Sequence, residues 1–160
     1  EDYAINLWKR AEVKVGLWLQ GQLLLGLIMG LIVYVGLSLM GIKFALILGF
    51  LVAILEIVPM VGPVLAAIPA IFLAFLLSPA LGLWVILFYV VVQQLENHLL
   101  VPVVLGKTVG LNPVVVIIAL LMGQQLAGIP GMILSVPLAT IIVEMMDDFA
   151  KHKDSRRTIT

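Results

Sequence analysis

The chain has 160 residues, of which 63% are hydrophobic and 11% charged, and its mean hydropathy is +1.24. These values lie outside the usual range of water-soluble globular domains. Nine basic residues balance nine acidic ones, which excludes the basic surface that a nucleic-acid partner requires. The absence of cysteine excludes disulfides, thiolate nucleophiles and cysteine-bound metals. We therefore expect a protein that contacts membrane lipid and no nucleic acid.

The first 40 residues divide into a mixed segment and an apolar one. Residues 1–16 combine charged and apolar side chains, which predicts an amphipathic helix at the membrane interface or a linker helix. They open without methionine or a signal-peptide pattern, so we expect the chain to be part of a longer polypeptide. Residues 17–40 carry no formal charge and are long enough to cross about 30 Å of hydrocarbon. Gly26 and Gly30 form a G-x-x-x-G pair, a spacing that permits close helix packing and makes a homo-oligomer plausible.

The following apolar runs, 44–58 and 64–77, are both short for a full crossing. They are separated by Pro59, Gly62 and Pro63. Because each proline removes a backbone donor and disfavours helix before it, we expect a broken helix or a re-entrant hairpin at this point.

The second half of the chain repeats this alternation of apolar runs and breaks. Residues 80–105 can span the bilayer with tilt, and two short runs, 113–127 and 132–146, follow as short spans or as a second hairpin. Over the whole chain, the expected helix breaks are Pro59, Gly62, Pro63, Pro102, Gly106, Pro113, Gly128 and Pro130.

About six hydrophobic segments between residues 17 and 146 predict an all-α fold, a polytopic transmembrane helical bundle with broken or re-entrant helices. Residues 147–160 form a charged tail. Basic side chains precede the first span and follow the last, so the positive-inside rule places both ends in the cytoplasm. That requires an even number of crossings, which six full spans or two re-entrant hairpins both satisfy.

Two lone carboxyl groups are the first candidates for chemistry. Glu56 and Glu96 are the only acidic residues between Glu12 and Glu144. An ionisable side chain in a spanning segment is costly unless it is paired, hydrated or protonated, so its default role is a proton, ion or polar-solute site. The alternatives are a hydrated helix end for Glu96 and a water-facing helix end for Glu56.

Several amides accompany these carboxyl groups. At 100° per residue, Gln93, Glu96 and Asn97 share one helix face, which is too polar to face lipid. Gln124, near the second break, can hydrogen-bond a neutral solute or bridge two helices. We expect Glu96 to be the main polar anchor of a route for solutes, with Glu56 second and Gln93, Asn97 and Gln124 beside them.

Catalysis is not expected. The chain has no G-x-S-x-G or H-E-x-x-H motif and only two histidines, and its serines are too few to suggest a nucleophile with a base. We expect no cofactor and no bound metal site. A membrane scaffold that only oligomerises is a further class, which would explain the glycine pairs but not two carboxyl groups beside broken helices.

Three strings in a fixed order carry a family resemblance: EIVPMVGP at 56–63, QQLENHLLVP at 93–102 and GKTVGLNP at 106–113. Together with GIPGM at 128–132 and VPLA at 136–139, they resemble the autoinducer-2 exporter family of bacterial permeases. The resemblance covers nearly all of residues 17–146. The family pattern falls on Glu56, Pro59, Gly62, Pro63, Gln93, Glu96, Asn97, Pro102, Gly106, Lys107, Gly110 and Pro113.

The resemblance implies a multi-pass permease of the bacterial inner membrane. It implies export of the quorum-sensing signal autoinducer-2 or, in some members, exchange of sodium for protons. The partner is then a small polar solute or a monovalent cation. Because family members are about twice this long, the chain is expected to be the C-terminal half of such a protein.

Overall fold

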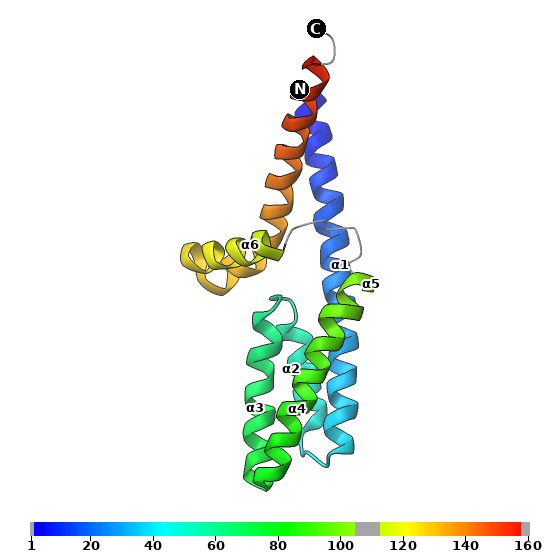
Figure 1. Ribbon diagram of the computed structural model, residues 1–160, viewed down its shortest axis with the longest axis vertical. Helices are drawn as coiled ribbons and strands as arrows, with labels where there is room; N and C mark the ends of the chain where they lie inside the picture. The colour runs from blue at the N-terminus through cyan, green and yellow to red at the C-terminus, as the bar shows by residue number, and fades with distance from the viewer. Residues whose placement is uncertain (1, 105–112, 158–160) are drawn as a thin grey trace. The chain divides into compact units, whose positions relative to one another are not determined.

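The computed structural model describes the backbone of residues 2–104 and 113–157, and the side chains of residues 9–10, 12–104, 114–143 and 145–146. Over these residues the chain is helical, with short turns and no strand (Figure 1). This confirms the predicted all-α fold. The chain forms two compact units: a central unit, Gln20–Lys107, and a terminal unit made of Glu1–Leu19 and Thr108–Thr160.

The first helix, α1 (Asp2–Leu39), runs through both units without a break. It joins the expected amphipathic segment and the first apolar span in one helix of 38 residues. Its stretch Glu12–Leu39 is long and apolar enough to cross a membrane. Helix is the natural conformation for such a segment, because lipid offers no partner to its backbone N–H and C=O groups.

The rest of the central unit contains α2 (Ala45–Leu55), α3 (Val61–Leu77), α4 (Pro79–Leu95), a π-helical turn η1 (Glu96–Leu100) and α5 (Val101–Val104). The helices α2 and α3 form a hairpin, and α3 packs along α4 (Figure 1). With 11 residues, α2 is about 16 Å long, roughly half of the hydrocarbon thickness. The hairpin therefore has the short, broken form that the two prolines predicted.

A single turn joins α3 to α4. Ser78 has an extended backbone, and its hydroxyl accepts a hydrogen bond from the amide of Leu81 at 3.1 Å. Pro79 follows as the first helical residue, a position where its missing N–H costs nothing. From there Pro79–Val104 continues through η1 as a second stretch able to cross a membrane.

Regularly spaced apolar side chains fill the core of the central unit. Every fourth residue of α3 from Ala66 to Ala74 is a fully buried alanine, and α1 contributes a buried ridge at the same spacing. Without a hydrophobic driving force between helices in lipid, such close van der Waals packing is the main source of their association. The core residues are Leu25, Met29, Val33, Leu37, Ile42, Ala45, Leu48, Val52, Ala66, Ala70, Ala74, Val85 and Val92.

The G-x-x-x-G pair of α1 packs against α2 within the chain. A methyl group added at Gly26 would lie 2.6 Å from the carbonyl oxygen of Ala53. One added at Gly30 would lie 2.7 Å from the carbonyl oxygen of Gly49. These glycine faces are therefore used to bring two helices of the same chain together, and they give no support to a homo-oligomer.

The break between α2 and α3 differs in detail from the expected one. It lies at residues 56–60, and Pro59 is in it, with Met60 at a φ of 66°. Gly62 and Pro63 belong to the first turn of α3, where the N–H that proline lacks has no partner within the helix. Gly62 is needed for close approach, since a Cβ there would collide with the carbonyl of Leu55.

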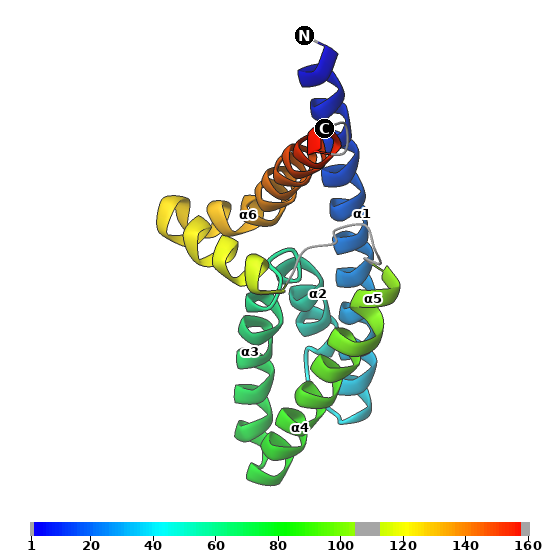
Figure 2. The same cartoon turned by 45° about the horizontal axis from the view of Figure 1, so that its top comes forward.

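The terminal unit contains α6 (Pro113–Arg157), which is bent at Ala127 and Gly128. Gly128 has a φ of 59°, which glycine adopts without strain, and the chain reverses there (Figures 1 and 2). Gly123 and Gly131 lie on either side of the bend, where their backbones touch. Although the stretch Val114–Val143 is apolar enough to cross a membrane, the bend divides it into two shorter arms.

We predict that Gly26→Ala destabilises the protein. The added methyl group would push α1 from α2, and such overpacking typically costs about 1–3 kcal/mol. Thermal unfolding of the full-length protein in detergent should show a lower midpoint. Gly16→Ala is the matched control, because no atom lies within 4 Å of its Cβ position and alanine favours helix. Equal midpoints for the two variants would contradict the proposed packing.

Candidate functional site

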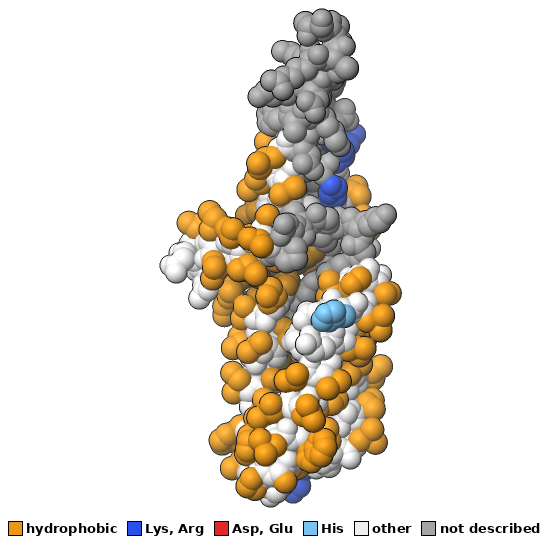
Figure 3. Space-filling view, viewed as in Figure 1, with side chains coloured by type: hydrophobic (Ala, Val, Ile, Leu, Met, Phe, Trp, Pro, Cys, Tyr) orange, Lys and Arg blue, Asp and Glu red, His pale blue; other side chains and the backbone are white. Residues whose placement is uncertain are grey.

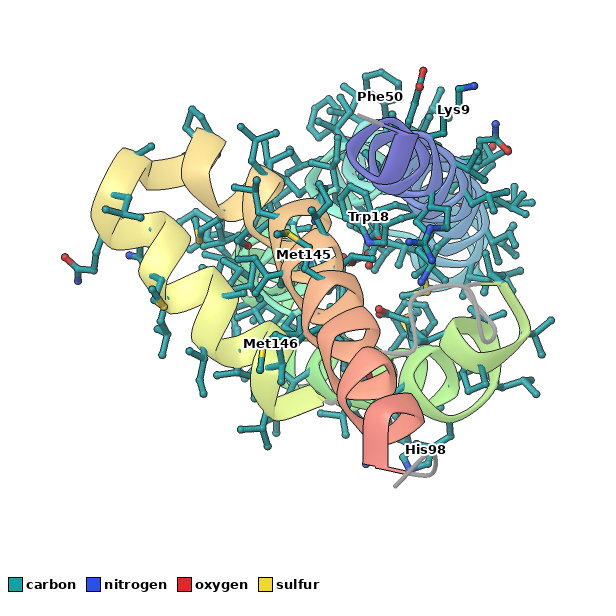
Figure 4. The ribbon with its side chains drawn as sticks, turned by 90° about the horizontal axis from the view of Figure 1, so that it is seen from above. Lys9, Trp18, Phe50, His98, Met145 and Met146 are labelled. Carbon is teal, nitrogen blue, oxygen red and sulfur yellow. The ribbon has the colours of Figure 1, made fainter. Side chains whose placement is uncertain are left out.

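The outer surface of the central unit is apolar. Large side chains such as Phe50 and Phe72 are more than half exposed, and Figure 4 shows Phe50 pointing outward. On the face drawn in Figure 3, hydrophobic side chains dominate, and none of the described acidic side chains is visible. This surface suits lipid, so a polar function must lie inside the unit.

Among the described residues of the central unit, three polar side chains are buried: Gln22, Glu56 and Glu96, with exposed fractions of 2%, 1% and 4%. They come from α1, the end of α2 and the end of α4, and Glu56 lies at the turn that joins α2 to α3. Both glutamates were singled out from the sequence, and both side chains are buried in the structure. Interior placement of a polar residue in a spanning bundle usually marks a solute or ion route.

Glu56 is the residue at which α2 ends. Its amide donates to the carbonyl oxygen of Val52 at 2.9 Å, which completes the last turn of the helix. Neither carboxyl oxygen has a hydrogen-bond partner among the described residues. The carboxyl group of Glu56 is therefore buried within the unit, beside the carboxyl group of Glu96.

Glu96 begins the π-helical turn of the long helix. Its Oε2 accepts a hydrogen bond from Nε2 of Gln93 at 2.9 Å, as their spacing of three residues allows. Its carboxyl group is also the neighbour of the Glu56 carboxyl group. The structure thus brings together two residues that are 40 positions apart, and we call them the carboxyl pair.

Gln22 is a member of the site that sequence reasoning missed. Its Nε2 donates to the backbone carbonyl oxygen of Glu56, while its Oε1 is buried without a hydrogen-bond partner in the described structure. Its place on α1 is one turn before Gly26, whose Cβ position lies 3.2 Å from Cβ of Glu56. A polar residue four positions before a G-x-x-x-G pair was the available signal, because it shares the face that packs most closely.

Two carboxylates this close cannot both keep their charge in a low-dielectric interior without compensation. Burying one uncompensated charge already costs several kcal/mol, and repulsion between two adds to it. A shared proton, a bound cation or a polar solute that donates hydrogen bonds would each resolve the conflict. The arrangement is therefore suited to bind one of these three ligands and, in the described residues, holds no group of His, Cys, Asp and Glu large enough for a typical metal site.

Comparison with known proteins identifies the family of this chain. The sequence profile of AI-2E family transporters matches residues 1–151. The chain belongs to the AI-2E transporter family. This confirms the resemblance carried by the proline-glycine and QQLENH strings, and it makes the molecule a multi-pass membrane protein of a transport family.

Individual relatives of this AI-2E family member support the assignment. "Putative transport protein YueF" of Bacillus subtilis is 39% identical over 138 residues, covering 86% of this chain and 37% of the relative. "AI-2 transport protein TqsA" of Escherichia coli is 33% identical over 138 residues, covering 86% of this chain and 40% of the relative. The chain thus spans about two-fifths of the length of the curated relatives it matches.

The other predicted site residues of this AI-2E chain lie apart from the carboxyl pair. Asn97 is exposed on η1, although it directly follows buried Glu96. His98 is also exposed, and its Nδ1 donates to the carbonyl of Gln94 at 2.9 Å. Gln124 is exposed on α6, in the terminal unit.

Of the helix breaks predicted in the second half of the chain, some lie at a helix end or bend and one lies inside a helix. Pro102 lies inside α5, which continues to Val104, and Pro113 is the first residue of α6. Gly128 forms the bend of α6, with Pro130 just after it. Gly106 lies outside the described residues.

Burial of the carboxyl pair predicts selective chemical labelling. An apolar carbodiimide, which partitions into the bilayer and reacts with protonated carboxyl groups, should modify Glu56 or Glu96 in the full-length AI-2E protein. A water-soluble carbodiimide should modify exposed Glu12 and spare both. Peptide mass spectrometry of the labelled protein provides the measurement. Rapid labelling of the pair by the water-soluble reagent would show that the site is open to water.

Proposed function

We propose that the full-length protein containing this chain exports a small polar solute through a route at the carboxyl pair, and that autoinducer-2 is this solute. The observation that carries the proposal is the burial of Glu56 and Glu96 side by side at a broken hairpin, inside an otherwise apolar unit. A hydroxyl-rich, neutral solute can donate hydrogen bonds to both carboxylates and so replace the water that they lack. The name of the TqsA relative supports the choice of solute.

The geometry supports a position of the site deep in the bilayer. Lys43 is exposed at the turn that precedes α2, where a charged side chain can reach the membrane surface. Eleven helical residues later, about 16 Å along the helix, the chain reaches Glu56. Half of a hydrocarbon core is about 15 Å, so this depth supports a site near the midplane, where broken helices of transporters commonly bind their substrates.

A transport function accounts for the buried carboxyl pair better than a scaffold or an enzyme does. A scaffold that only oligomerises has no need for two buried carboxyl groups without strong partners, which cost stability. Catalysis would require an activated nucleophile or a positioned base beside an electrophile site, and the carboxyl pair offers neither arrangement. We place the protein in the bacterial inner membrane with both ends of this chain in the cytoplasm, as the flanking lysines and arginines favour. We also propose that the full-length protein forms a homo-oligomer, and we assign no surface of this chain to that contact.

Glu96→Gln should abolish autoinducer-2 efflux from proteoliposomes that contain the full-length protein. Because a hydrogen bond to a charged group contributes about 1.5–3 kcal/mol, we expect the efflux rate to fall about tenfold or more. The same change at exposed Glu12 is the control for the lost carboxylate and should leave the rate unaltered. Efflux that survives Glu96→Gln would remove the carboxyl pair from the route, and wild type without efflux would refute the proposed solute.

Exchange of sodium for protons is the second candidate, and the closeness of the two carboxyl groups favours it. A pair that holds either one proton or one cation is the simplest device by which one ion can replace the other. Under this function, a sodium pulse outside proteoliposomes should drive proton movement, reported by a pH-sensitive dye in the lumen. Glu56→Gln should abolish the signal, whereas Glu12→Gln should keep it. A wild-type signal that is independent of sodium would exclude the exchange.

A further inference from the structure

We infer that Tyr89 is a further residue that contacts the exported solute, by donating a hydrogen bond from its hydroxyl to an oxygen of the solute. The inference rests on the proposed function, because it adds a contact to the same export route. The carrying observation is that this hydroxyl is buried in the central unit and has no hydrogen-bond partner among the described residues. The fold therefore keeps a donor in an apolar interior without using it.

An unpartnered hydroxyl is unfavourable in this part of the chain. Tyr89 lies near the middle of the stretch Pro79–Val104, which is long and apolar enough to cross a membrane, so little water is available to the hydroxyl. A buried hydroxyl without a partner destabilises a protein, and for this reason most buried polar groups are hydrogen-bonded. Phenylalanine would fill the same space without that penalty. A partner that arrives with the solute explains why the hydroxyl is there.

Helix geometry places Tyr89 on the same face of α4 as Glu96. The buried residues of α4 are Gly82, Val85 and Val92, and Tyr89 falls between the two valines in a row, spaced by three and four residues, that ends at buried Glu96. Seven residues make almost two helical turns, so Tyr89 and Glu96 differ in direction by about 20°. Tyr89 therefore belongs to the interior face that also carries the carboxyl pair.

Neighbouring side chains hold the ring of Tyr89 in place. The ring of Phe88 meets it edge to face, with centroids 5.8 Å apart and planes at 76°. Phe88 in turn packs on α1 at Gly36, where a Cβ would lie 2.2 Å from the Phe88 ring. Tyr89 also packs against the hydrophobic core of the unit. Because the ring is already fixed, little conformational freedom is lost when its hydroxyl meets a solute.

The carboxyl pair and Tyr89 lie at successive levels of the unit. Seven helical residues separate Tyr89 from Glu96 by about 10 Å along α4, and aromatic side chains of a helix point toward its N-terminus, which is away from Glu96. A small solute therefore meets the two contacts one after the other. The ionised pair offers acceptors, and Tyr89 offers a donor. A neutral solute with several hydroxyl groups suits both, because each hydroxyl donates and accepts.

Efflux from proteoliposomes that contain the full-length protein tests the inference. Tyr89→Phe removes only the hydroxyl, so the maximal rate of autoinducer-2 efflux should fall about two- to tenfold, as expected for the loss of one neutral hydrogen bond. Tyr34→Phe is the matched control, because it removes the same group from a ring that is 37% exposed on α1, and it should transport like wild type. Equal rates for Tyr89→Phe and wild type would overturn the contact.

Unfolding midpoints separate a solute contact from a structural one. Without solute, Tyr89→Phe should unfold at the same temperature as wild type or at a higher one, because it removes a buried hydroxyl without a partner. A midpoint well below that of wild type would mean that the hydroxyl forms a bond within the fold, and the inference would be overturned.

Infrared difference spectroscopy of the purified full-length protein tests the contact without any transport step. Addition of autoinducer-2 should shift a tyrosine C–O band, because the frequency of this bond depends on the hydrogen bonding of the hydroxyl. The shift should be present in Tyr34→Phe and absent in Tyr89→Phe. Wild type that shows the shift but no efflux would leave the contact standing and overturn export. Wild type that exports without the shift, or a shift that persists in Tyr89→Phe, would overturn the contact and leave export standing.

Discussion

The close approach of α1 to α2 is the contact on which the candidate site depends. Two glycines of α1 lie against the backbone of α2, and any side chain at Gly26 would meet the carbonyl of Ala53. Only at this distance can the amide of Gln22 reach the carbonyl at the end of α2. Because that carbonyl belongs to Glu56, the same contact fixes the position of the carboxyl group that faces Glu96. In lipid, packing of this kind is also the main attraction between helices, so one contact serves both stability and the site.

The central unit distributes its side chains in the opposite way to a soluble domain. Many of its large apolar residues, such as Phe50, point outward, while alanines of α3 and glycines of α1 lie at the helix contacts of the interior beside larger core residues. Small interior residues bring the helices close together, which leaves little room for water around the buried polar groups. A ligand that enters must therefore replace hydration by contacts with the protein, and the few polar oxygens at the end of α2 are the groups able to provide them.

Much of this arrangement follows from hydropathy and proline positions alone. The apolar runs became helices, the α2–α3 hairpin has a break near Pro59, and the two lone glutamates proved to be neighbours. The pairing itself could not be derived, since it depends on how α2 and α4 pack, which no local pattern encodes. Gln22 was missed because an uncharged glutamine in an apolar run does not by itself indicate a functional site. Asn97 was placed with Glu96 because both lie near one face of a regular helix, but the structure buries Glu96 and leaves Asn97 exposed in the π turn that forms there.

That π turn has a consequence for how α4 could have evolved. A π turn holds one residue more than an α turn, and such turns can be viewed as single-residue insertions into a helix. Deleting one residue within Glu96–Leu100 would restore regular α-helix and leave the segments before and after it facing the same directions, whereas regular α-helix with that residue retained would rotate everything after it by about 100°. The turn thus lets the segment up to Glu96 and the segment after it keep their directions within one continuous span that holds the additional residue. Mutational change downstream, around Pro102, can proceed without turning Glu96 away from Glu56.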